Sequence, residues 1–263
     1  MKKIILRAYV IVGILFLFLF LYGLFNLRLS VQRKYPLTGY SEITEYSMST
    51  VRDEEAPLGE KIVISFRLKD VRSDFNTLLF LTAHQNVVVY LGSEQVYHME
   101  VNPGVILPKS PGVVYNEVVF NDVDNGRTVR IELFPVYASA YKIPDFMLGN
   151  GYQIIKVILL SNLPILSLCF CVIVIGVLQI IIALVSGKEV ENLPIALTHS
   201  AFTIVVGLWK MLDSDFVALF TKSLPVLSVL PFIVMMFFPL MMKKVIFDLL
   251  GTDRSFVWQA PDW

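Results

Sequence analysis

Four long apolar runs constrain the fold of this chain more than any other feature. One lies near the start, at Ala8–Phe25, and three lie in the second half, at about Val157–Val185, Ile195–Leu212 and Val226–Met242. A bilayer core of about 30 Å is crossed by about 20 apolar residues in a helix, and each run is near or above that length. The polar segment between the first two runs is long enough to fold as a domain. The pattern therefore predicts a membrane protein that presents one folded domain on one side of the bilayer.

The composition supports this class and excludes several kinds of site. Hydrophobic residues make up 56% of the chain and the mean hydropathy is +0.66, whereas soluble domains are about 45–50% apolar. The 22 basic and 22 acidic residues cancel, so no basic field attracts nucleic acid and we expect no nucleic-acid partner. Cys169 and Cys171 both lie in the second apolar run, which excludes a disulfide framework and a zinc site built on cysteine.

The start of the chain has the pattern of an uncleaved signal anchor. Lys2, Lys3 and Arg7 precede the first apolar run, as in a signal peptide, but the run is longer than a signal-peptide core and no Ala-Xaa-Ala cleavage pattern follows it. We interpret residues 1–26 as a membrane anchor, with a cleaved signal peptide as the alternative.

The distribution of basic residues predicts the orientation. The three N-terminal cations place the N-terminus in the cytoplasm by the positive-inside rule, so residues 27–153 lie outside the cytoplasm. Lys243 and Lys244, at the end of the last run, agree with this topology, whereas the basic residues just after the first run are a counter-signal.

The extracytoplasmic segment has the pattern of an antiparallel β-sandwich. Residues 64–69 alternate between apolar and polar side chains, and residues 78–82 form the continuous apolar stretch of a buried strand. Gly92 and Ser93 separate two further runs and predict a tight hairpin turn. At least five or six strands are expected, at residues 62–69, 78–82, 86–91, 95–99, 116–120 and 128–134. Since no amphipathic helix separates them, they favour a jelly-roll-like sandwich.

The expected fold class is thus an α+β membrane protein in four parts. These are a signal-anchor helix (1–26), an extracytoplasmic β-sandwich (27–153, beginning with a stalk and a first edge strand), a block of three transmembrane helices (154–250) and a cytoplasmic tail or truncation point (251–263).

Residues that could carry chemistry are few. His84 and His98 are the histidines of the sandwich, and neither accompanies a nucleophile motif or a set of metal ligands. We therefore expect no catalytic residue, metal or cofactor, and an enzyme is the least favoured class. His84 lies in a turn between two predicted strands, where it is either an ordinary hydrogen-bonded turn residue or a ligand contact.

Tyrosines supply the other candidates for ligand binding. Tyr90, Tyr97 and Tyr115 lie on or beside predicted strands, where their rings can stack on a sugar or dock a peptide. The alternative is that they belong to the sandwich core or to the aromatic belt at the membrane interface.

A dense polar cluster ends the third apolar run. It comprises Trp209, Lys210, Asp213 and Asp215. Charged side chains at membrane depth are costly and often functional, and these residues are candidates for coupling the external domain to helix movement. The alternative is that these residues have only a structural role at the predicted outer interface. Trp209 would then anchor the helix in the headgroup region, Lys210 would extend its ammonium group to water, and the two carboxylates would be solvated.

Short motifs in this chain resemble one bacterial receptor family. They are His84–Gly92 (HQNVVVYLG), Val96 and Tyr97, Lys109–Gly112 (KSPG), Leu148–Asn150 (LGN), Gly207–Trp209 (GLW) and Leu212–Asp215 (LDSD). Their order is similar to that in seven-transmembrane receptors with diverse intracellular signalling modules, many of which carry a GGDEF diguanylate cyclase domain. The resemblance covers most of residues 60–242.

The resemblance implies the input half of a signal transducer. The family's further spans and its GGDEF-like loop are not found in this chain, so no cyclase activity is assigned to it and we expect a fragment of such a receptor. The partners that we expect for the chain are the lipid bilayer, an unidentified extracytoplasmic ligand (a small molecule, carbohydrate or peptide) and a second copy of the chain. The alternative is a membrane-anchored module that binds carbohydrate or protein without signalling.

Overall fold

The computed structural model describes residue 22 and residues 39–101, 110–186, 193–222 and 225–250. This part of the chain divides into two compact units. The sheet unit comprises residues 39–163 and 214–230, and the helix unit comprises residues 164–213 and 231–250, within those described. The first apolar run, and with it the predicted signal anchor, lies outside the described residues except for Tyr22.

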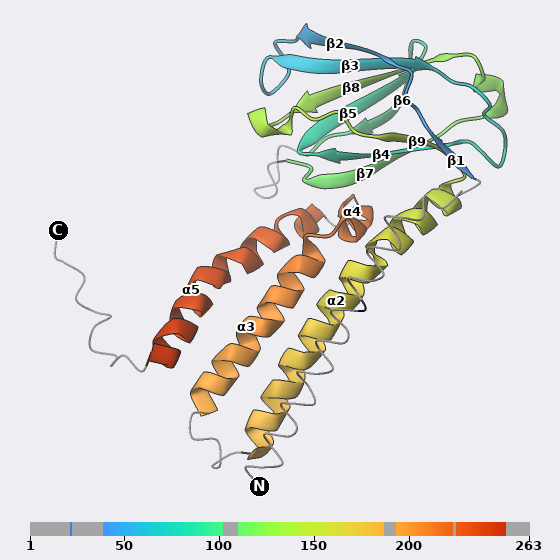
Figure 1. The fold of residues 1–263 in the computed structure, drawn as a ribbon. Helices are drawn as coiled ribbons and strands as arrows, with labels where there is room; N and C mark the ends of the chain where they lie inside the picture. The colour runs from blue at the N-terminus through green and yellow to red at the C-terminus, as the bar shows by residue number, and fades with distance from the viewer. Residues whose placement is uncertain (1–21, 23–38, 102–109, 187–192, 223–224, 251–263) are drawn as a thin grey trace, which may run out of the picture. The chain divides into compact units, whose positions relative to one another are not determined.

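The sheet unit contains nine strands in two antiparallel sheets (Figure 1). The four-stranded sheet has the order β1-β9-β4-β7, formed by Tyr40–Glu42, Phe146–Gly149, Thr77–Ala83 and Val113–Val119. The five-stranded sheet has the order β2-β3-β8-β5-β6, formed by Ser47–Arg52, Glu60–Arg67, Thr128–Pro135, Gln85–Leu91 and Glu94–Met99. Two pairs of consecutive strands form hairpins within one sheet, β2-β3 and β5-β6. In every other pair of consecutive strands, one strand lies in one sheet and the next strand lies in the other sheet.

One apolar core joins the two sheets. Alternate residues of β3, β5 and β7 point inward, as the period of two requires. Ile64 of β3, Phe80 of β4 and Ile131 of β8 are among the fully buried side chains. Phe146 of β9 lies between the sheets, with its ring centroid 5.3 Å from that of Phe80 and 5.9 Å from that of Phe66. Burial of this core is the main stabilising contribution to the sheet unit.

The six predicted strands correspond to β3–β8, and the predicted hairpin is confirmed. Gly92 adopts φ +65° between β5 and β6, a conformation that favours glycine. β9 was not predicted, because a strand of four residues is too short for a recognisable period. One edge strand was expected within residues 27–55, and the structure has two there, β1 and β2, each at the edge of its sheet.

The remaining elements of the sheet unit are short, apart from the start of a long helix. They are the 3₁₀-helices η1 (Asp122–Asp124), η2 (Ala138–Ala140) and η4 (Pro225–Ser228) and the α-helix α4 (Asp215–Thr221). Helix α2 (Gly151–Ser186) contributes its residues up to Leu163 to the sheet unit, and Pro164 onward to the helix unit.

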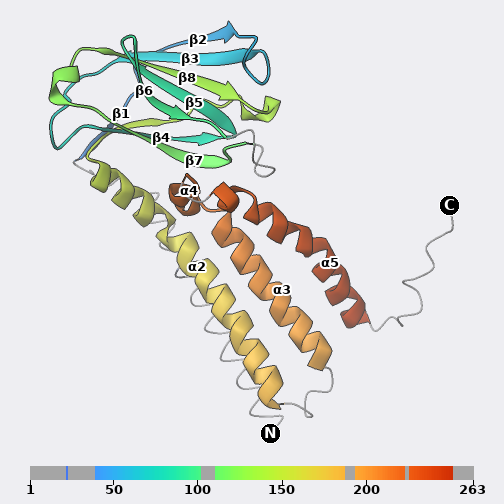
Figure 2. The same cartoon turned by 180° about the vertical axis from the view of Figure 1, so that it is seen from behind.

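The helix unit consists of the rest of α2 together with α3 (Leu193–Leu212) and α5 (Leu230–Leu250), which Figure 2 shows from behind. Three described segments are long and apolar enough to cross a membrane: Gly151–Ser186, Leu193–Leu212 and Val226–Phe247. The predicted block of three apolar helices is therefore present.

Small residues and aromatic contacts hold the helix unit together. A side chain at Gly176 of α2 would collide with Ile204 of α3, and one at Gly207 of α3 would collide with Ile173 of α2. Such small residues allow helix backbones to approach closely, which is the usual packing in a membrane. On the other side of α3, the Trp209 ring packs edge to face on Phe238 of α5, with 5.3 Å between centroids.

Candidate functional site

A second apolar core lies on the outer face of the four-stranded sheet, where helical segments cover it. Its buried residues are Leu79 of β4 and Ile154 and Ile158 of α2. Partly buried residues pack around these three: Tyr40, Tyr115, Met147 and Leu219. We call these seven residues the docking core. They come from four strands and from two helices, α2 and α4, that are separated in sequence by α3. Both helices therefore pack on this one face of the sheet.

The start of α2 is fixed to this face without a linker. β9 ends at Gly149 and α2 begins at Gly151. The intervening Asn150 accepts a hydrogen bond from the Gln153 backbone N–H at its side-chain Oδ1, at 3.2 Å, and so caps the helix. Because Ile154 and Ile158 are four residues apart, they lie on the same face of α2 and both point at the sheet.

The connection between α3 and α5 also rests on the sheet unit. α4 packs against β7, and its Ala218 and Thr221 are buried. Just after α4, the Lys222 Nζ lies 4.6 Å from the centroid of the Tyr97 ring, a cation–π distance. In η4, Ser228 lies so close to Gly112 that a Cβ at position 112 would collide with its side chain.

The predicted coupling cluster is divided between the two units. Lys210 Nζ and Asp213 Oδ2 form an ion pair at 3.0 Å, with both side chains about half exposed, and Trp209 packs within the helix unit. Asp215 is the first residue of α4 in the sheet unit. Burial, with a smaller contribution from the charge of Asp215, raises the pKa of Tyr115 to about 12. The boundary between the units thus falls inside this cluster, after Asp213.

Tyr97 belongs to a buried chain of hydrogen bonds that joins the two sheets. Its hydroxyl donates to Asn116 Oδ1 at 3.0 Å, and Asn116 Nδ2 donates to Thr82 Oγ1 at 2.8 Å. Asn116 is fully buried, so these bonds satisfy a polar group that would be costly without partners. Burial, and then the charge of Glu117, raises the pKa of Tyr97 to about 12.

His84 forms the one-residue corner between β4 and β5. It has a positive φ of 57°, and its backbone N–H donates to the Gly112 carbonyl at 2.7 Å. Its Nδ1 lies 2.7 Å from Ser110 Oγ, and its ring packs edge to face on Tyr137. Burial lowers the pKa of His84. These contacts are those of a hydrogen-bonded turn residue that fixes the corner.

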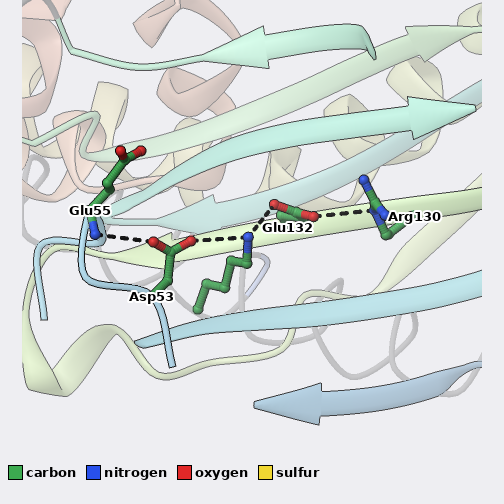
Figure 3. Close-up of polar contacts among 5 residues, drawn as sticks. Asp53, Glu55, Arg130 and Glu132 are labelled. Atoms are coloured by element: carbon green, nitrogen blue, oxygen red, sulfur yellow. Dashed lines mark hydrogen bonds and ion pairs between the residues drawn. The ribbon is translucent and has the colours of Figure 1, made fainter. Parts of the chain in front are cut away.

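Tyr90 lies on the outer face of the five-stranded sheet, beside charged residues that the sequence did not single out. The Arg130 guanidinium lies 4.4 Å from the centroid of the Tyr90 ring. Arg130 Nε is also 3.2 Å from Glu132 Oε1, although it does not have hydrogen-bond geometry there. Lys61 Nζ bridges Glu132 Oε2 at 2.9 Å and Asp53 Oδ2 at 3.0 Å (Figure 3).

This network is internally balanced. The side chain of Glu132 is only 9% exposed, and its carboxylate lies between two cations, an arrangement that compensates a nearly buried charge. Hydrogen bonding to Glu132 raises the pKa of Lys61, and the hydrogen bond from Lys61 lowers the pKa of Asp53. The sequence shows that Arg130 and Glu132 share one face of β8, because they are two residues apart. It does not show that Lys61 joins them, because that contact depends on the register between β3 and β8.

The four candidate ligand-binding residues lie in four different places. His84 is at the corner, Tyr90 is on the outer face of the five-stranded sheet, Tyr97 is in the buried chain and Tyr115 is in the docking core. The structure does not bring them into one site. Among the described residues, no group of three or more His, Cys, Asp or Glu side chains is placed to hold a metal ion.

Comparison of the sequence with protein-family models finds no match, and comparison with curated proteins finds none either.

Proposed function

We propose that this chain is the membrane-anchored input region of a signal transducer. In this proposal the sheet unit is an extracytoplasmic sensory domain, residues 1–26 are its signal anchor, and α2, α3 and α5 are membrane spans that carry a change in the domain inward. The resemblance to seven-transmembrane receptors with diverse intracellular signalling modules would make a diguanylate cyclase domain the output.

The strand order supports a jelly-roll domain. With β2 as an additional edge strand, the remaining strands form two four-stranded sheets, β1-β9-β4-β7 and β3-β8-β5-β6, whose strands alternate between the sheets along the chain. That alternation, with one hairpin in the second sheet, is the arrangement of a jelly roll, a fold that presents its loops at either end for binding.

The length of α2 supports a direct connection between domain and membrane. A helix of 36 residues is about 54 Å long at 1.5 Å per residue, whereas about 20 residues cross the bilayer core. The surplus includes the segment with Ile154 and Ile158 that packs on the sheet.

The docking core is the observation on which the proposal depends. It places the start of one predicted span, α2, and the connection between two others, α3 and α5, on the same sheet face. A ligand that favours one arrangement of this face would therefore bias all three helices. A ligand that binds both arrangements equally would transmit nothing.

A fusion of the full chain to a diguanylate cyclase domain at its C-terminus tests the proposal. Leu79→Ala removes the central sheet side chain of the docking core. We expect it to change the cyclase rate in membranes by about fivefold or more, because typical coupling between two sites changes an equilibrium by at least about that factor. The matched control is Leu58→Ala, at an exposed leucine before β3, which should leave the rate unchanged.

The alternative function, binding without signalling, predicts a different result. An unchanged rate in the Leu79→Ala fusion, with hydrogen exchange showing that the start of α2 has loosened, would contradict signal coupling. The sheet unit would then be a tethered binding domain.

A further inference from the structure

A cleft of about 1070 Å³ opens at one end of the sheet unit. The segment after β1, the loop between β3 and β4, and the turn before β8 form its walls. Apolar side chains lie at its base, among them Phe66, Leu68 and Leu148, which are buried, and Phe75, which is partly buried. Clefts of this kind, apolar at the base and polar at the rim, are where small ligands bind, and a drug-sized site measures about 300–1,000 Å³.

The cleft wall is rigidly built. Asn125 holds Val71 by two hydrogen bonds, accepting from its backbone N–H at 2.8 Å and donating to its carbonyl at 2.6 Å. Arg67 Nε donates to the Gly126 carbonyl at 2.6 Å, which fixes the guanidinium beside the cleft. Asp70 adopts a positive φ of 59° on the same wall, a conformation that aspartate tolerates better than most residues other than glycine.

The rim carries both signs of charge in equal number. Three side chains are basic and three are acidic: Arg67, Lys69, Arg72, Glu42, Glu45 and Asp70. Lys69 and Glu45 form an exposed pair at 3.3 Å, and Arg72 lies 3.9 Å from Asp74, also exposed. Exposed pairs of this type contribute little to stability, so a ligand can replace them at low cost.

This charge pattern selects among ligands. A simple anion would be attracted by the three basic side chains and repelled by the three carboxylates, and for a simple cation the attraction and repulsion would be reversed. A ligand with both a carboxylate and an ammonium group can pair with both kinds of charge on the rim. The fixed Arg67 guanidinium matches a carboxylate geometrically, and Asp70 or Glu42 can accept a hydrogen bond from an ammonium group. The apolar base then accommodates an aliphatic or aromatic side chain.

We propose that this cleft binds a zwitterion with an apolar side chain, either a free amino acid or a short peptide, as the input signal of the sensory domain. The proposal rests on the proposed function and adds the ligand class to it. The same loop reaches the start of α2: Asn150, the residue that caps α2, donates from Nδ2 to the Asp74 carbonyl at 3.1 Å. A ligand bound in the cleft would thus change the contacts of the first turn of α2.

Isothermal titration of the full chain in lipid nanodiscs tests the ligand class. The probes are L-leucine and trileucine, which carry both charges, and N-acetyl-leucine, leucinamide and N-acetyl-leucinamide, which lack one or both. We expect leucine or trileucine to bind at least roughly tenfold more tightly than the three blocked compounds, and the stronger of the two identifies the source, free amino acid or peptide. Failure of both to bind, or equal binding of N-acetyl-leucinamide, would overturn the proposal.

Two substitutions connect binding to the cleft. Arg67→Gln should weaken leucine or trileucine binding by roughly tenfold or more, whereas Arg52→Gln, an exposed arginine at the end of β2, should not. Unaltered binding by the Arg67→Gln protein would place the site elsewhere. Thermal unfolding of both variants separates loss of binding from loss of folding, since a surface Arg→Gln change has a small effect on stability.

A third substitution tests the connection to α2. In hydrogen exchange, the ligand should protect the first turns of α2 in the wild type, and Asn150→Ala should abolish that protection while changing affinity less than about twofold. Equal protection in both proteins would exclude Asn150 as the connection. These results are independent of the cyclase fusion, so the ligand class can fail while signal coupling stands.

Discussion

At the scale of single residues, the sheet unit depends on a few polar side chains that are buried with their partners. Asn116 is fully buried in the core and bonds both Tyr97 and Thr82, and Glu132 is nearly buried between Lys61 and Arg130. Each is stable because its partners are present, and removal of one partner would leave an uncompensated group.

The sequence identified some of these residues and not others, for a physical reason. His84 was recognised as a turn residue because it interrupts two apolar strands, and the structure places it at a corner with positive φ. Asn116 and Glu132 were missed as partners, because their contacts are made across strands that are 14 or more residues apart in the chain. Residue type and local period carry no information on such pairings.

His84 leads to a prediction on pH dependence. Burial lowers its pKa in the folded chain below the ordinary value of 6.5, so the unfolded chain binds this proton first as pH falls. The contribution of neutral His84 to stability is therefore present above about pH 6.5 and is lost as pH falls toward the lower folded pKa. We expect the melting temperature of the wild type to fall more between about pH 8 and about pH 5 than that of His84→Asn.

Asparagine is suitable at this position because it tolerates positive φ. The same change at the exposed His98 of β6 is the control, and it should keep the steeper wild-type loss. If His84→Asn and wild type lose stability in parallel over this range, the titration of His84 does not contribute.

At the scale of elements, the short segments determine how the sheet unit is arranged. The sequence predicted β3–β8 from period and length, and it predicted three long apolar helices. It predicted one edge strand within residues 27–55, where the structure has both β1 and β2, and it did not predict β9 or α4, which have four and seven residues. These elements are formed by packing: β1 pairs with β9, β9 with β4, and α4 covers β7. Tertiary contacts stabilise them, and local propensity does not.

The docking core leads to a prediction at this scale. Ile154→Ala removes a fully buried side chain from the contact between α2 and the sheet, and such a truncation costs about 2–5 kcal/mol. Because α2 continues far beyond this contact, we expect faster hydrogen exchange in residues 151–163 and little change in residues 164–186. Ile180→Ala, whose side chain is only partly buried in the helix unit, is the control. Uniform loosening of all of α2, or none, would contradict a local contact.

At the scale of the whole molecule, the proposed function requires that the sheet unit and the end of α2 lie on opposite sides of a membrane. The three apolar segments are long enough to cross one, and the sidedness is a prediction from the basic residues at the N-terminus and after the last run, under the positive-inside rule. The start of α2 and the connection between α3 and α5 pack on the sheet unit. In the proposed topology these segments would be the external ends of the spans.

Cysteine labelling in intact cells measures this sidedness directly. Val123 in η1 is 85% exposed and Val185 near the end of α2 is 83% exposed, and the parent chain with Cys169 and Cys171 sets the background. We predict that a membrane-impermeant maleimide labels the Val123→Cys protein in intact cells and labels the Val185→Cys protein only after permeabilisation. Labelling of Val123→Cys that required permeabilisation would place the sheet unit in the cytoplasm and contradict the proposed extracytoplasmic position.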